Sequence, residues 1–268
     1  MSNVSGRAGE GRLKGLLSTL GGRLSLLFWF LVVAIAAPVV LPDGPTISVL
    51  MGLALFVLML SGLNAISERR RSVLLGLAMA LPAAVLNLVG LAAANLQIYL
   101  VSQYIWLAFF AYLALQILRW TLRQHDVDAE TIYGAVSVYL LMALIWGVAY
   151  YSIAITSPGS FHFPAEDRLG QIQAQRAAAV ETGAELEAAT PAIWTDRANS
   201  ASGTMMYYSF VTLTTLGYGD IYPVSDAARI LGMLEATLGQ LYLVILVARL
   251  VGLYTSQESE RRRKATPT

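Results

Sequence analysis

The segment Thr212-Leu213-Thr214-Thr215-Leu216-Gly217-Tyr218-Gly219-Asp220 decides the fold. It completes an apolar, helix-like stretch over 204–214 that is too short to cross a membrane. Non-helical backbone at membrane depth has to be buried in protein or line a water-filled path. The glycines that flank Tyr218 permit positive φ, so successive carbonyl groups can point to the same side. Repeated around a symmetry axis, such carbonyls can replace the water shell of a dehydrated cation.

The rest of the chain is too apolar for a soluble protein. Of its 268 residues, 56% are hydrophobic and 13% are charged, whereas soluble domains have roughly 25% charged residues. A bilayer core of about 30 Å requires about 20 apolar residues in a helix. Stretches of suitable length and composition lie near 24–41, 46–66, 72–94, 98–118, 132–155 and 228–253. We therefore expect an all-α integral membrane protein with six transmembrane helices and one half-span.

The basic residues predict the orientation in the membrane. With the N-terminus in the cytoplasm, all but four of the 18 Lys and Arg residues fall on the inner side; the exceptions are Arg168, Arg176, Arg197 and Arg229. We expect a multi-pass protein of the cell membrane with both termini in the cytoplasm. A signal peptide cleaved after Ala34-Ile35-Ala36 is a competing interpretation of the first span, but the apolar run continues to Leu41.

Composition also excludes several classes of protein. The chain has no cysteine, which excludes disulfides, thiolate metal sites and a cysteine nucleophile. Its two histidines, His125 and His162, fall on opposite sides of the membrane in this topology, so no histidine metal site or catalytic triad forms within one chain. A net charge of +1 argues against nucleic-acid binding. We expect neither an enzyme nor a cofactor.

Residues 212–220 resemble the filter motif of the tetrameric potassium-channel superfamily, T-x-T-T-V-G-Y-G-D, with Leu216 at the position where Val is commonest. With the flanking spans, the resemblance covers about 132–254. It implies a homotetramer that conducts potassium ions, which are the transported species. The residues implied to coordinate K⁺ are Thr215, Leu216, Gly217 and Tyr218. Gly219 would let the filter open outward, and Asp220 at the outer mouth would bond to an aromatic residue of the pore helix, for which Tyr208 is the candidate.

The resemblance also assigns roles to the last span. Gly239 lies where related channels have a hinge in the inner helix, and close helix packing is the alternative role for this glycine. Gln240, Leu243 and Val247 would line the central cavity. Glu235 is a carboxylate within the membrane, so it should face protein or water; we expect it to brace the pore helix, with tuning of the site as the alternative. Ser225 and Asp226 predict an N-cap and an acidic first turn for this helix.

The expected organisation begins with a cytoplasmic segment, 1–23, a four-helix bundle, 24–120, and a cytoplasmic linker, 121–131. A pore domain, 132–256, follows, with an outer helix at 132–155, an extracellular turret at 157–203, a pore helix at 204–214, a filter at 215–219 and an inner helix at 228–253. The basic tail, 257–268, contains a possible anionic-lipid contact at Arg261, Arg262, Arg263 and Lys264. The turret carries six carboxylates against three arginines, so it either concentrates cations at the mouth or plays no part in permeation; its Ala-rich portion, 171–189, could form a helical cap.

Two features of the sequence limit the function further. The fourth span has no basic residue before Arg119, so we expect no steep voltage dependence. An ion-coupled transporter or potassium-uptake subunit is one rival function, although those relatives carry four filter-like segments in one chain. A membrane receptor or scaffold with a non-conducting pore half is the other.

Overall fold

The computed structural model describes residues 23–40, 70–93, 95–124, 126–157, 159–164, 170–171 and 191–265. The expected second span, 46–66, the Ala-rich cap and most of the N-terminal segment lie outside these described residues. The described helices are α2 (Arg23–Val40), α4 (Arg70–Ala92), α5 (Leu96–Arg123), α6 (Ala129–Thr156), α8 (Pro191–Leu213) and α9 (Asp226–Ala265). Two short strands, β1 (Phe161–His162) and β2 (Tyr222–Pro223), pair antiparallel.

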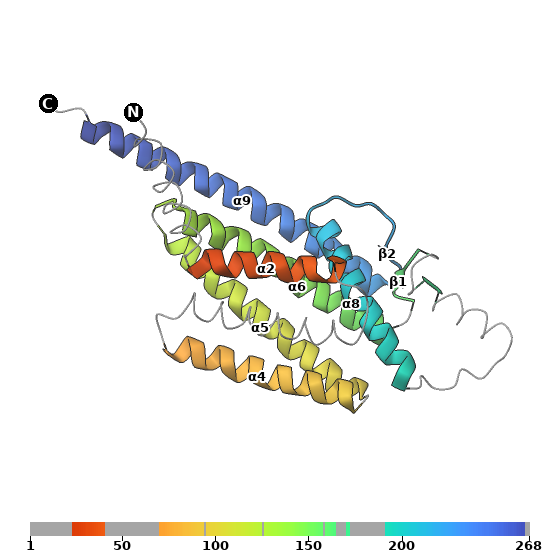
Figure 1. The fold of residues 1–268 in the computed structure, drawn as a ribbon. Helices are drawn as coiled ribbons and strands as arrows, with labels where there is room; N and C mark the ends of the chain where they lie inside the picture. The colour runs from red at the N-terminus through yellow and green to blue at the C-terminus, as the bar shows by residue number, and fades with distance from the viewer. Residues whose placement is uncertain are drawn as a thin grey trace, which may run out of the picture.

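Three helices are long and apolar enough to cross a membrane. They are Leu96–Arg123, Ala129–Thr156 and Asp226–Ser259, and shorter apolar helices cover Leu24–Ala36 and Leu74–Gly90. The structure is thus mostly helical, as expected for a membrane protein, whereas the count of six spans stays a prediction. Figure 1 shows α4 along one edge and α9 along the other. Between them, α5 packs against α4, and α6 packs against both α5 and α9.

Local sequence explains where the central helices begin. The Asn95 side chain accepts hydrogen bonds from the backbone N–H groups of Gln97, at 3.0 Å, and Ile98, at 3.2 Å, at the start of α5. The Asp128 side chain accepts from the N–H of Thr131 at 2.8 Å at the start of α6. Gly90 lets α4 and α5 pack closely, because a Cβ on Gly90 would lie 2.8 Å from the Tyr99 nitrogen.

Two helices differ in length from the expectation. The helix that leads to residues 215–219 begins at Pro191 instead of 204, and proline is well suited to a first helical turn because its missing N–H has no partner there. The last helix continues to Ala265 instead of ending near 253. The Nε of Arg262 lies 3.2 Å from the Glu258 carboxylate, an i,i+4 pair that favours helix in this last part.

Two clusters of buried side chains hold the helices together. One joins α2, α4, α5 and α6, and it centres on large residues such as Phe109, Phe110 and Leu113. The other lies where α6 meets α8 and the β1–β2 pair, and it contains Tyr150, Phe161 and Met205. The second cluster positions α8, and with it the segment that follows α8.

The C-terminal half of α9 is hydrogen-bonded to the end of α5. The Arg249 guanidinium donates to the carbonyl oxygens of Thr121, Leu122 and Gln124 at 2.8, 2.6 and 3.0 Å. These carbonyls lie at the C-terminal end of α5, where unpaired carbonyl groups and the helix dipole favour a cation. Farther along α9, Gln257 Nε2 donates to Asp126 Oδ1 at 2.9 Å.

We expect Arg249→Ala to destabilise the fold by about 2–3 kcal/mol, because three charge-assisted hydrogen bonds are lost. Thermal unfolding of the full chain in detergent measures this change. Arg262→Ala is the matched control on the same helix, since its ion pair with Glu258 is exposed and worth little. Equal shifts for the two variants would contradict the prediction.

Candidate functional site

Residues 215–219, the filter segment, have an alternating backbone conformation. Thr215, Gly217 and Gly219 have φ of 58°, 60° and 78°, and no positive φ is found at the two residues between them. Positive φ is unusual for a β-branched residue, so the conformation of Thr215 was not evident from its residue type. An alternation of this kind turns successive carbonyl groups to one side of the chain.

The N–H groups of this stretch point back to the end of α8. The N–H of Thr215 donates to the Thr212 carbonyl at 3.0 Å, and the N–H groups of Leu216 and Gly217 both donate to the Val211 carbonyl, at 2.9 and 3.2 Å. Among the described residues, no hydrogen bond ends on the carbonyl oxygens of residues 215–218. The segment therefore presents a row of carbonyl oxygens that the described part of the chain does not use.

The inner helix fits closely against the C-terminal end of α8. A Cβ on Gly239 would lie 2.7 Å from both the carbonyl oxygen and Cδ1 of Leu213. The Tyr139 hydroxyl, from α6, donates to the same Leu213 carbonyl at 3.1 Å. This geometry supports close packing as the role of Gly239, and the hinge role stays a prediction.

Glu235 joins three helices behind the filter segment. It is fully buried, and its Oε2 accepts a hydrogen bond from the Tyr150 hydroxyl of α6 at 2.7 Å. Its Oε1 lies 2.5 Å from the Ser209 hydroxyl of α8, which also lies 2.8 Å from the Ala143 carbonyl of α6. The structure supports the bracing interpretation of Glu235. The sequence did not single out Tyr150 or Ser209, because neither stands out among many hydroxyl groups until the helices are packed.

At the outer end, Asp220 bonds to Tyr207, so the expectation that Tyr208 is its partner was wrong. The Tyr207 hydroxyl donates to Asp220 Oδ2 at 2.8 Å. Tyr208 instead packs against Tyr150 and Phe161, with ring centroids 4.9 and 5.4 Å apart. Neighbouring residues differ by about 100° around a helix, so only one of the two tyrosines can face Asp220. Desolvation and the bond to Asp220 raise the pKa of Tyr207 to about 12.

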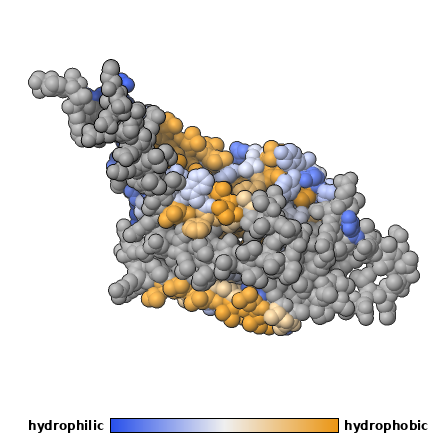
Figure 2. All heavy atoms as spheres, viewed as in Figure 1, coloured by the Kyte–Doolittle hydropathy of each residue, from blue (hydrophilic) through white to orange (hydrophobic). Residues whose placement is uncertain are grey.

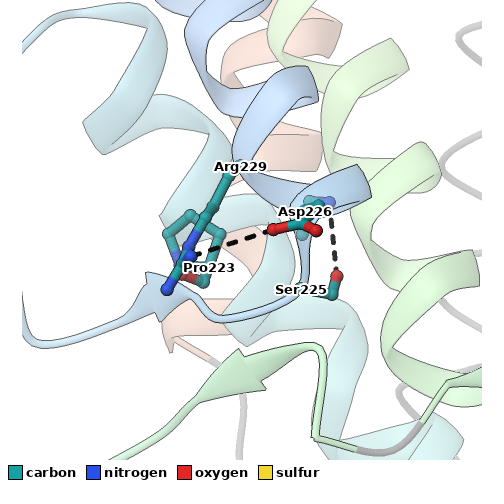
Figure 3. Close-up of polar contacts among 5 residues, drawn as sticks. Pro223, Ser225, Asp226 and Arg229 are labelled. Atoms are coloured by element: carbon teal, nitrogen blue, oxygen red, sulfur yellow. Dashed lines mark hydrogen bonds and ion pairs between the residues drawn. The ribbon is translucent and has the colours of Figure 1, made fainter.

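The start of α9 and the strand pair form the surface beside Asp220. The Ser225 hydroxyl accepts from the Ala228 N–H at 3.3 Å, which confirms the predicted N-cap. Figure 3 shows Arg229 reaching back toward Asp226, at 3.9 Å, and its Nε donates to the Pro223 carbonyl at 3.4 Å. The His162 ring stacks on Tyr222, with centroids 4.5 Å apart, across the β1–β2 pair.

The predicted cavity residues share the exposed side of α9. Gln240, Leu243 and Val247 are all exposed, and Gln240 Nε2 donates to the Thr215 hydroxyl at 3.1 Å. Nothing in the described residues tests whether these three side chains face a cavity. Within the described ranges, no group of three or more His, Asp or Glu side chains could hold a metal ion.

Gly239→Ala should destabilise the fold by about 1–3 kcal/mol, because the new methyl group meets a backbone oxygen and α9 has to move away from α8. Gly252→Ala is the matched control: it lies on the same helix, nothing lies within 4 Å of its added Cβ, and alanine favours helix. Thermal unfolding in detergent compares the two. A Gly239→Ala protein of unchanged stability with a reduced open probability would instead support the hinge.

Comparison with known proteins gave one match. A search of curated proteins found no match. A family model described as "Ion channel" matches residues 184–256, which include α8, the filter segment and most of α9. Together with the apolar helices, this match supports an ion channel domain in a membrane protein as the assignment for this part of the chain.

Proposed function

We propose that the chain is a potassium-selective channel in which four copies surround one pore. The observation that carries this proposal is the backbone of residues 215–219. The N–H groups of residues 215–217 donate to α8, while the carbonyl oxygens of 215–218 have no hydrogen-bond partner among the described residues. In the proposed tetramer these carbonyl groups are buried, and buried carbonyl groups without partners are costly in protein. A dehydrated cation on the pore axis supplies the missing interaction. Thr215, Leu216, Gly217 and Tyr218 are then the ion-coordinating residues.

A homotetramer follows from this role, because one chain supplies one strand of carbonyls and a single strand cannot surround an ion. The surface of the single chain supports association. Figure 2 shows apolar side chains along α9 at one edge and along α4 at the other. On α9, large exposed side chains include Ile230, Met233, Leu234, Leu238, Leu241, Val244 and Ile245. In the proposed tetramer, part of the α9 surface contacts the neighbouring subunits and part faces the cavity, and α4 faces lipid.

The remaining parts take roles consistent with this arrangement. Helices α2, α4 and α5 form a peripheral bundle around the pore module. Both termini lie in the cytoplasm, and Arg261, Arg262, Arg263 and Lys264 then lie at the inner membrane surface, where anionic lipid headgroups attract basic residues. Conduction is passive and makes no chemical bond, so the chain needs no cofactor.

Rubidium flux into liposomes that contain the full chain tests the proposal. We expect flux that potassium competes for and sodium does not, and we expect Gly217→Ala to abolish it, since an alanine at φ of 60° is strained and disturbs the carbonyl row. Gly159→Ala is the matched control, because Gly159 also has positive φ and open space but lies in the loop after α6. No flux from the wild-type chain would favour the non-conducting rival, and flux driven by an ion gradient would favour the transporter.

The open probability should be nearly independent of voltage. Moving one charge through 100 mV gives about 2.3 kcal/mol, and steep sensors move about three or four charges per subunit. In α5, the basic residues are Arg119 and Arg123, both near the C-terminal end of the helix, where the field is already small. Conductance–voltage curves in planar bilayers with symmetric potassium measure this property. An apparent gating charge of several units per tetramer would show that charges elsewhere cross the field.

A further inference from the structure

Gln240 links the inner helix to the inner end of the filter segment. Its Nε2 donates to the Thr215 hydroxyl at 3.1 Å. The contact depends on the neighbouring Gly239. A Cβ at this position would lie 2.7 Å from the Leu213 carbonyl oxygen, so a side chain there would push α9 away from the end of α8. A cavity-lining role alone gives no reason for a bond from this amide to the filter.

Thr215 is a residue whose orientation needs support. Its φ of 58° places a β-branched residue in the left-handed region, which is strained. Its N–H is held by the Thr212 carbonyl, so the backbone is fixed, but the hydroxyl can still rotate. A threonine hydroxyl has one hydrogen and two lone pairs. A hydrogen bond from Gln240 occupies one lone pair and limits the directions left to the other lone pair and to the hydrogen.

We propose that Gln240 is a positioning residue for the innermost cation site, a proposal that rests on the potassium-channel function above. Its amide holds the Thr215 hydroxyl so that the free lone pair, and not the hydrogen, faces the ion. In a tetramer, four such amides fix four hydroxyls around the axis before the ion arrives. The site is then pre-organised, and a cation that enters from the cytoplasm loses its water to ligands that need no rearrangement.

Barium is a suitable probe, because it is a divalent cation of nearly the size of potassium. It blocks the pore at a site where protein oxygens replace its water shell. The measurement is the affinity of block by barium applied from the cytoplasmic side to full-length channels in planar bilayers. We expect Gln240→Leu and Gln240→Met, which lack the donor, to weaken block about five- to tenfold, the effect of losing roughly one neutral hydrogen bond. Gln257→Leu is the matched control, since it makes the same change on the same helix at a side chain bonded to Asp126.

A double-mutant cycle shows whether Gln240 acts through the hydroxyl. Thr215→Val removes the hydroxyl and keeps the shape of the side chain. In this background, Gln240→Leu should cause no further change in barium affinity, because the group that it orients is gone. Equal effects of Gln240→Leu in the two backgrounds would overturn the proposal and leave Gln240 as a lining residue.

The outcomes separate this inference from the proposed function. A wild-type chain without potassium current would overturn the channel function itself. A conducting wild type whose barium block is unchanged in both Gln240 variants would overturn the positioning role alone. The two variants differ in side-chain shape, so assembly of either suffices for the measurement. Failure of both to assemble would assign Gln240 a structural role and would also overturn the proposal.

Discussion

The Val211 carbonyl accepts hydrogen bonds from both Leu216 and Gly217, and this double acceptance at the end of α8 governs the region around it. It commits the N–H groups of these two residues of the filter segment to the side of α8. The carbonyls are left on the other side. The position of the carbonyl row therefore depends on the position of α8. Helix α8 is held by the contacts of Ser209 with Glu235 and the Ala143 carbonyl, and by the bond from Tyr139 to the Leu213 carbonyl.

Those contacts come from helices distant in sequence. The hydroxyl groups of Tyr150 in α6 and Ser209 in α8 both bond to the carboxylate of Glu235 in α9. Tyr139 of α6 reaches the last carbonyl of α8, at Leu213. A carboxylate among apolar helices is costly unless hydroxyl groups satisfy it. The same cost fixes the position of α8 along α6, because a shift of α8 would remove the Ser209 hydroxyl from Glu235 and leave a carboxylate oxygen unsatisfied. Helix α8 is in this way fixed by two helices that are long and apolar enough to cross a membrane.

Much of the arrangement could be predicted from the sequence. Hydropathy places α2, α4, α5 and α6 within about five residues of their observed ends, because a membrane-spanning length is a strong constraint. The Gly217-Tyr218-Gly219 pattern indicates the left-handed turns, and Ser225 indicates the cap. The left-handed Thr215, the choice of Tyr207 over Tyr208 and the bond from Gln240 could not be predicted in the same way. The conformation of Thr215 depends on the turn that follows α8. The contacts of Tyr207 and Gln240 depend on which side of a helix faces its neighbour, and composition does not encode this.

The strand pair has a consequence for how this chain can change over time. Phe161 and His162 pair with Tyr222 and Pro223, and the Val224 N–H donates to the Ser160 carbonyl at 2.8 Å, so the chain that leaves α6 is fastened beside the exit of the filter segment. The other end of the intervening stretch is rooted in α8 at Pro191. Because both roots are fixed, lengthening or shortening the stretch between them costs little closure entropy and does not move the roots. Insertions, deletions and grafted epitopes between residues 164 and 191 should therefore leave the strand pair and α8 in place.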